Sequence, residues 1–112
     1  MIEVFIGSGA GGVLRYCIGI ISKKLFHQSW PGTLMVNVIG SILIVLIVQK
    51  IAISNERISR LILVGFLGGF TTFSSFSLEI FNKVSQGQYL MAGTIFSLNI
   101  LLGIVMGILI LR

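Results

Sequence analysis

The sequence places glycines and threonines in the middle of an apolar run, where they do little for a regular helix. Gly68 and Gly69 are followed, after one phenylalanine, by Thr71 and Thr72. Glycine and β-branched residues lower helix propensity, and a helix broken inside a membrane presents carbonyl oxygens to cations and helix N-termini to anions. If two copies met at such a break about a two-fold axis, their carbonyls would converge on a site for a small cation such as Na⁺. The alternative is an unbroken helix with tight glycine packing.

Two phenylalanines follow the predicted break. Phe73 and Phe76 are three residues apart and share a helix face. Because the edge of an aromatic ring carries partial positive charge, a pair of edges can attract an anion that is losing its water without trapping it as a Lys would. The alternative is that both rings are packing residues.

A polar strip runs beside these rings. Thr72, Ser75 and Glu79 lie at positions i, i+3 and i+7, and Ser74 lies at the margin of the strip. Hydroxyl groups within a bilayer are expected to face protein or water rather than lipid. An ionised Glu79 beside an anion path is unfavourable unless it is protonated, paired or turned aside, and the sequence leaves these alternatives open.

The second apolar run carries a similar stripe. Thr33, Asn37 and Ser41 lie at i, i+4 and i+8. The Asn37 amide has two N–H donors that could bind a passing anion, or it could join two helices. Arg15, inside the first run, is costly there unless it snorkels or faces water, and we expect it to add positive potential to an anion vestibule.

The composition requires membrane helices to position these residues. The 112 residues are 55% hydrophobic and 10% charged, whereas soluble domains are about 25% charged. Apolar runs at about 4–22, 33–53, 61–82 and 89–111 are each long enough to cross a bilayer. We therefore predict an all-α membrane protein with a single transmembrane domain over residues 1–112, which leaves no room for a soluble enzyme fold.

The distribution of charge predicts how the chain inserts. The chain has a net charge of +5, and its Lys and Arg residues lie between the apolar runs, at the depth of the lipid headgroups. We therefore expect them to contact membrane lipid and not nucleic acid. The cations divide almost evenly between two sides, namely Lys50, Arg57, Arg60 and Arg112 against Lys23, Lys24 and Lys83. A chain without a decisive bias can insert both ways, which predicts an antiparallel dual-topology dimer. The alternative is a single orientation set by a weaker cue.

Three motifs resemble, in order and spacing, those of the Fluc (CrcB) family of fluoride channels, and the resemblance covers nearly the whole chain. They are the segments Gly11–Tyr16, Gly32–Gly40 and Gly65–Glu79. The resemblance implies an antiparallel dimer with two pores, each lined by both subunits, and a third helix that is broken in mid-membrane. It also implies passive export of cytoplasmic fluoride across the plasma membrane, which gives fluoride resistance, and no enzyme activity.

The resemblance also assigns roles to individual residues. The main-chain oxygens of Gly68 and Thr71 would bind a structural Na⁺ at the centre of the dimer. The resemblance also places Arg15, Asn37, Phe73, Ser74, Ser75, Phe76 and Glu79 along the fluoride pathway. We add Thr33 and Ser41 to this expected pathway, because they share a helix face with Asn37. Family members often carry a Tyr and, four residues later, a Ser on the fourth helix, and the nearest residues here are Ile95 and Asn99.

Two other functions stay open. A proton-coupled exporter of cationic drugs would need a titratable acid in the middle of a membrane helix, whereas Glu3 lies close to the start of its helix and Glu79 lies toward the far end of its span. A chain that pairs with a related paralogue in a heterodimer is compatible with Ile95 at the position where a Tyr is expected.

Overall fold

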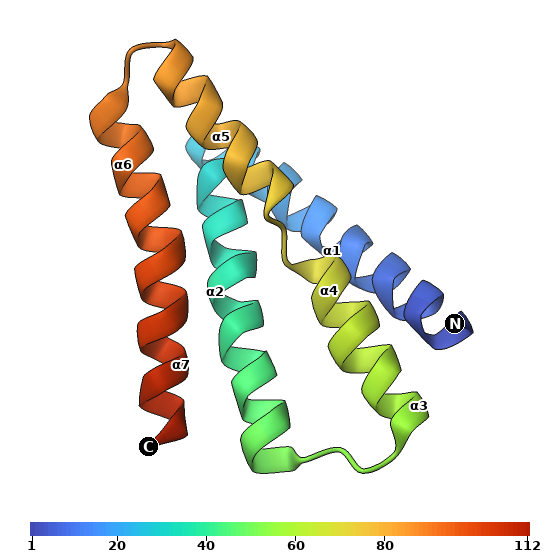
Figure 1. Cartoon of the computed structure of the whole chain (residues 1–112). Coiled ribbons are helices and arrows are strands. Elements are labelled where there is room, and N and C mark those ends of the chain that lie inside the picture. Colours follow the sequence, from blue (N-terminus) through green and yellow to red (C-terminus); the bar gives the residue numbers. More distant parts are fainter.

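The computed structural model describes all residues from Met1 to Arg112 and consists of helices joined by short loops (Figure 1). Four helical segments are long and apolar enough to cross a bilayer, namely Ile2–Phe26, Trp30–Ile51, Glu56–Ser85 and Tyr89–Leu111. The expectation of an all-helical protein with four spanning helices is therefore confirmed.

The spans are subdivided where the helical hydrogen bonding changes. The first span is α1 (Ile2–Phe26), and the second joins α2 (Trp30–Leu46) to the π-helical η1 (Ile47–Ile51). The third span contains α3 (Glu56–Ser59), the π-helical η2 (Arg60–Leu67), α4 (Gly68–Phe70) and α5 (Ser74–Ser85). The fourth contains α6 (Tyr89–Ser97), the π-helical η3 (Leu98–Leu102) and α7 (Gly103–Leu111).

Local sequence explains several helix ends. Pro31 occupies the first turn of α2, where a missing N–H leaves no helical bond unmade. Asn55 caps α3, because its side-chain oxygen accepts hydrogen bonds from the backbone N–H groups of Arg57 and Ile58 at 2.9 and 3.2 Å. The third span therefore begins at Glu56, several residues before the apolar run itself.

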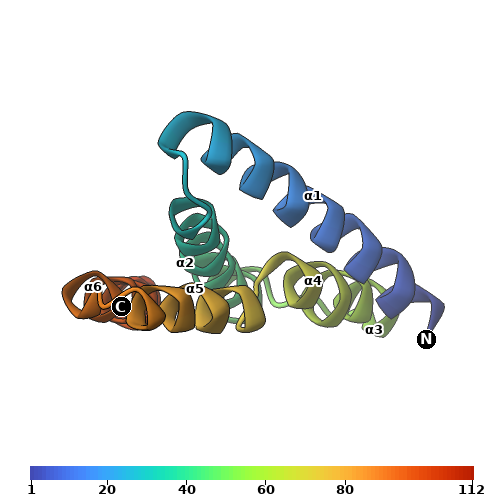
Figure 2. The ribbon, with the colours of Figure 1, turned by 90° about the horizontal axis from the view of Figure 1, so that it is seen from above.

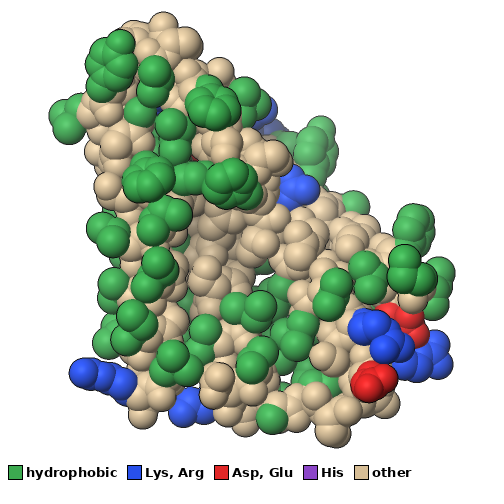
Figure 3. Space-filling model, viewed as in Figure 1, with side chains coloured by type: hydrophobic (Ala, Val, Ile, Leu, Met, Phe, Trp, Pro, Cys, Tyr) green, Lys and Arg blue, Asp and Glu red, His purple; other side chains and the backbone are tan.

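The spans form an open, flat arrangement with extents of 48 × 32 × 22 Å. Seen from above, α1 runs obliquely across one face of the other spans (Figure 2), and it packs against η2 and α4 while α2 packs against α7. The smallest extent is about two helix diameters. Only 17 of the 112 residues are buried, and hydrophobic side chains cover much of the surface, as a lipid environment requires (Figure 3).

Glycines allow α1 and the third span to meet backbone to backbone. A Cβ atom on Gly7 would overlap the carbonyl oxygen of Leu61, and a Cβ atom on Gly69 would overlap that of Ser8. Residues with side chains would force the two helices apart. This close contact fixes α1 beside η2 and α4, the helices that lead into the candidate site.

Candidate functional site

The segment between α4 and α5 leaves backbone groups without their usual helical partners. Thr71 is extended, with φ −83° and ψ 158°, and the next amide, Thr72 N, donates to the side chain of Asn37 instead of the Gly68 carbonyl. A Cβ atom on Gly68 would have no neighbour within 4 Å. The Gly68 carbonyl therefore lacks its helical donor, and Gly68 is among the residues that line a cavity; main-chain oxygens without helical donors can bind cations.

Asn37 of α2 holds this segment in place. Its Oδ1 atom accepts from Thr72 N at 2.8 Å, and its Nδ2 atom donates to Thr72 O at 3.0 Å. The same Nδ2 atom donates to Oδ1 of Asn99 in η3 at 2.9 Å. Asn37 thus connects the second, third and fourth spans. Because an amide nitrogen carries two hydrogens, both donors of Asn37 are used within the protein.

Thr72 also organises the start of α5. Its Oγ1 atom accepts a hydrogen bond from Ser75 N at 3.1 Å and lies 3.3 Å from Oγ of Ser74. The N-terminus of a helix carries partial positive charge. The segment before α5 is therefore favourable for an anion on electrostatic grounds.

The two phenylalanines lie together but in different surroundings. The ring centroids of Phe73 and Phe76 are 5.6 Å apart, with the planes tilted by 50°. Phe76 is 5% exposed and contacts the ring of Phe96 in α6 at a centroid distance of 6.2 Å, whereas Phe73 is 76% exposed. Phe76 is thus part of the packed interior of the chain, and Phe73 extends from its surface.

A cavity of about 400 Å³, which we call the Phe cavity, lies between the second, third and fourth spans. The surface is hollowed between the second and third spans (Figure 3). The expected site residues that line this cavity are Asn37, Ser41, Gly68, Thr71, Phe73 and Phe76. Asn99 and Thr72 also line it, and none of its lining residues is charged. Its polar groups are therefore neutral amides, hydroxyls and main-chain atoms.

A second cavity of about 310 Å³, which we call the Glu79 cavity, also borders the segment between α4 and α5, because Thr72 is among its lining residues. The expected site residues that line it are Arg15, Thr33, Ser75 and Glu79. Lys23 contributes a second cation, and Thr72 lines both cavities. The polar residues expected along one pathway are thus distributed over two cavities that meet at Thr72.

Glu79 is 8% exposed and is held by two hydroxyl groups. Its Oε1 atom accepts from Thr33 Oγ1 at 2.6 Å and from Ser29 Oγ at 3.0 Å, while its buried Oε2 atom has no hydrogen-bond partner. The acid is therefore turned toward α2 and the loop before it. The sequence offered no signal that Ser29 takes part.

Arg15 lies beside the Glu79 cavity, and its Nε atom donates to the Gly69 carbonyl at 3.0 Å. It thus stabilises the end of α4, where carbonyl groups lose their helical partners. Ser74 differs from the other expected residues, because it is exposed at the start of α5 and lines neither cavity.

The fourth span contributes Asn99, which the sequence analysis named only as the residue nearest to the Ser that family members often carry there. Asn99 is 8% exposed and contacts Asn37, whereas Ile95, one turn earlier, is fully buried and purely apolar. The available signal was a second asparagine inside an apolar span, since such amides usually bond to other helices.

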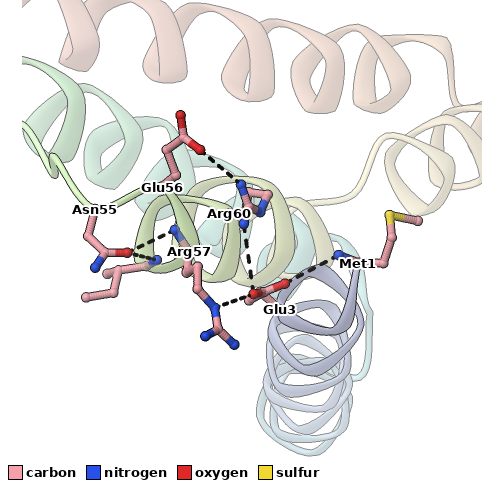
Figure 4. Close-up of polar contacts among 7 residues, drawn as sticks. Met1, Glu3, Asn55, Glu56, Arg57 and Arg60 are labelled. Atoms are coloured by element: carbon pink, nitrogen blue, oxygen red, sulfur yellow. Dashed lines mark hydrogen bonds and ion pairs between the residues drawn. The ribbon is translucent and has the colours of Figure 1, made fainter.

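A separate cluster of charges lies where α1 begins (Figure 4). Glu3 lies 2.7 Å from Arg57 Nε, 3.9 Å from Arg60 Nη2 and 3.3 Å from the amino group of Met1. These ion pairs join the start of α1 to the third span. Neither Glu3 nor its partners line the Phe cavity or the Glu79 cavity.

These features define a class of protein, a small multi-pass membrane protein with polar cavities between its spans. A family model described as "CrcB-like protein, Camphor Resistance (CrcB)" matches residues 2–111. The chain belongs to the CrcB family.

Several relatives of the chain carry the name "Fluoride-specific ion channel FluC". The protein from Coxiella burnetii (strain CbuK_Q154) is 42% identical over 106 residues, which cover 90% of this chain and 82% of the relative. That from Cereibacter sphaeroides (strain ATCC 17029 / ATH 2.4.9) is 36% identical over 101 residues, covering 89% and 82%. That from Roseiflexus sp. (strain RS-1) is 42% identical over 97 residues, covering 83% and 78%.

Proposed function

We propose that this chain is a fluoride-specific ion channel, not an enzyme, and that it lets cytoplasmic fluoride leave the cell down its electrochemical gradient. The observation that carries the proposal is the identity of 36–42% to relatives of that name, over most of their length. In cells the channel lies in the plasma membrane and gives resistance to fluoride.

The chemistry of the Phe cavity supports this function. Fluoride holds its water tightly, so a pore must replace that hydration and yet release the ion. Neutral amides, hydroxyls and the edges of Phe73 and Phe76 suit this compromise, because none carries a full charge that would trap or repel the ion. The proposed fluoride pathway extends beyond the Phe cavity into the Glu79 cavity. Its residues are Arg15, Thr33, Asn37, Ser41, Phe73, Ser74, Ser75, Phe76 and Glu79.

The working channel is an antiparallel, dual-topology dimer. One chain is only 22 Å thick, which leaves little protein to close a pathway on all sides, and the ring of Phe73 is 76% exposed. A second copy in the opposite orientation supplies the missing wall. The partner is an identical chain, and the alternative is a related paralogue.

The interruption between α4 and α5 lies at the centre of this dimer, in mid-membrane, and holds a structural Na⁺. The main-chain oxygens of Gly68 and Thr71 are its ligands, because unwound carbonyl groups bind such cations. The missing helical donor at the Gly68 carbonyl supports this assignment. Na⁺ bound there supplies positive charge between the two copies.

Liposomes loaded with fluoride or chloride test the function. Purified protein is expected to release fluoride from the vesicles and to leave chloride inside. Equal release of both anions, or no release of fluoride, contradicts the proposal.

Labelling of a single cysteine tests the dual topology. The chain has one cysteine, Cys17, so a Cys17→Ser variant that carries Ser54→Cys has one thiol in the loop between the second and third spans. If both orientations are present, a membrane-impermeant thiol reagent is expected to label about half of the protein from each side of the membrane. Labelling of all the protein from one side only would show a single orientation and contradict the dual topology. A chain that forms dimers only when a paralogue is co-expressed contradicts the homodimer.

A further inference from the structure

We propose that a cleft at the connection between α5 and α6 binds one anionic phospholipid, whose phosphate contacts Lys83 and whose acyl chain lies along Leu90 and Met91. This cleft, which we call the Lys83 cleft, has a volume of about 530 Å³, and Gln28, Gln88 and Tyr89 also line it. None of its lining residues lines the Phe cavity or the Glu79 cavity. The site is therefore separate from the fluoride pathway, and the proposal does not rest on the proposed function.

A tight turn brings the ends of two spans to this cleft. Gly87 has a φ of 73°, a left-handed conformation that glycine adopts without strain, and the Gln88 backbone N–H donates to the Lys83 carbonyl at 2.8 Å. The chain therefore reverses directly after α5, at the end of the molecule opposite the C-terminus (Figure 1). Lys83, in the last turn of α5, and Tyr89, the first residue of α6, thus border the same cleft.

The charge of Lys83 has no carboxylate partner. Its Nζ atom donates to Gln28 Oε1 at 3.0 Å, which leaves two of its three N–H groups without a partner in the chain. Glu79 lies one turn earlier on α5, where it could form an i, i+4 ion pair with Lys83. Its Oε1 atom instead accepts from Thr33 and Ser29, so the positive charge of Lys83 stays uncompensated.

No other acid compensates this end of the chain. The sequence has three acidic residues, and the remaining two, Glu3 and Glu56, pair with arginines where the first and third spans begin (Figure 4). The cleft is lined by Lys83 and by no acid. It therefore favours the phosphate of a headgroup, and it offers no carboxylate to the amine of a zwitterionic headgroup.

The position of the cleft indicates a lipid as the source of that phosphate. Lys83 lies near the end of the third spanning segment, and Tyr89 begins the fourth. Tyrosine side chains are enriched at the depth of the headgroups. The next two residues, Leu90 and Met91, give the cleft an apolar wall that continues into the fourth span. Leu90 is 87% exposed, so an acyl chain can cover it, whereas a small soluble phosphate would leave this wall bare.

Native mass spectrometry of the full-length protein in detergent tests the site. The protein is mixed with equal amounts of phosphatidylglycerol and phosphatidylethanolamine that carry the same acyl chains. We expect one phosphatidylglycerol per chain to bind first as the lipid concentration rises. Lys83→Gln is expected to lower its affinity about fivefold, the loss that corresponds to one cation at an anionic lipid surface. Equal binding of the two lipids, or an unchanged affinity in Lys83→Gln, overturns the proposal.

Lys24→Gln is the matched control. Lys24 is an exposed lysine in the last turn of α1, at the same end of the molecule, and it does not line the Lys83 cleft. The variant is expected to keep the wild-type affinity for phosphatidylglycerol. An equal loss in Lys24→Gln and Lys83→Gln would show a general attraction of lipid to basic residues and would overturn the site.

A second variant and a soluble competitor test the role of the acyl chain. Leu90→Ser keeps Lys83 but removes part of the apolar wall, and it is also expected to weaken the binding of phosphatidylglycerol. Glycerol 3-phosphate supplies the phosphate without acyl chains and is expected not to displace the lipid. Unchanged binding in Leu90→Ser, or displacement by glycerol 3-phosphate at a concentration equal to that of the lipid, would show a site for soluble anions and overturn the proposal.

Discussion

Phe73 and Phe76 contact each other at a centroid distance of 5.6 Å, yet only Phe76 belongs to the packed interior of the chain. Substitutions at the two rings therefore make it possible to separate an effect on fluoride efflux from an effect on folding stability. A change at Phe76 alters packing against Phe96, whereas a change at Phe73 leaves the fold of one copy intact.

Phe73→Ile and Phe76→Ile are expected to reduce fluoride efflux, since each removes a positive ring edge from the Phe cavity. Phe76→Ile is also expected to lower the free energy of unfolding by about 1–2 kcal/mol, because it loses core contacts. Phe73→Ile is expected to leave it unchanged. Efflux from liposomes and thermal unfolding in detergent measure the two effects. Wild-type efflux in both variants would favour packing as their only role.

Asn37→Asp keeps the acceptor for Thr72 N but removes both donors and adds a negative charge at the Phe cavity. We expect fluoride efflux to fall at least tenfold while dimers persist on size-exclusion chromatography. Asn55→Asp is the matched control, because an aspartate caps α3 as well as an asparagine does. Normal efflux in Asn37→Asp would mean that the Asn37 amide is dispensable.

Thr33→Val removes the shorter of the two hydrogen bonds to Glu79 at nearly constant volume. Since the other carboxylate oxygen already lacks a partner, we expect a loss of stability of about 1–3 kcal/mol. Thr94→Val is the control, because the Thr94 hydroxyl donates only to its own helix, at Leu90. Equal melting temperatures for the two variants would show that Thr33 does not support Glu79.

Gly7→Ala places a methyl group against the Leu61 carbonyl, where the first and third spans are closest. We expect a destabilisation of about 1–3 kcal/mol or failure to fold. Gly9→Ala, on the same helix with no neighbour within 4 Å, is expected to be neutral. The yield of monodisperse protein and its melting temperature compare the two, and equal values would contradict the close contact of the helices.

Glu3→Gln tests the alternative of a proton-coupled drug exporter, which needs an acid in the transport path. Glu3 pairs with Arg57 and Met1 outside both cavities. Fluoride efflux is therefore expected to stay within about twofold of wild type, since Glu3 lines neither the Phe cavity nor the Glu79 cavity. Proton-driven transport of a quaternary ammonium ion by the wild type, lost in Glu3→Gln, would support the exporter instead.

The sequence was sufficient to predict the four spans, because about 20 apolar residues between polar loops leave few other structures possible. The limits of the spans were less predictable. The first helix continues to Phe26 since Lys23 and Lys24 can extend their charges to the membrane surface, and the third begins early because Asn55 caps it.

The partners of the polar residues were harder to predict. Asn37 contacts residues 35 and 62 positions away in the chain, and helical periodicity says nothing about contacts at that range. The periodicity placed Asn37 on a polar face, but only the packing of three spans determines which atoms occupy its donors. The same holds for Ser29 and Glu79, which are 50 positions apart.

The three residues between α4 and α5 also set the rotation of α5 about its own axis. Each residue of a helix turns the chain by about 100°, so one inserted or deleted residue between Phe70 and Ser74 would swing Ser75, Phe76 and Glu79 around together. We therefore expect insertions or deletions between α4 and α5 to be tolerated less well than substitutions of single residues there.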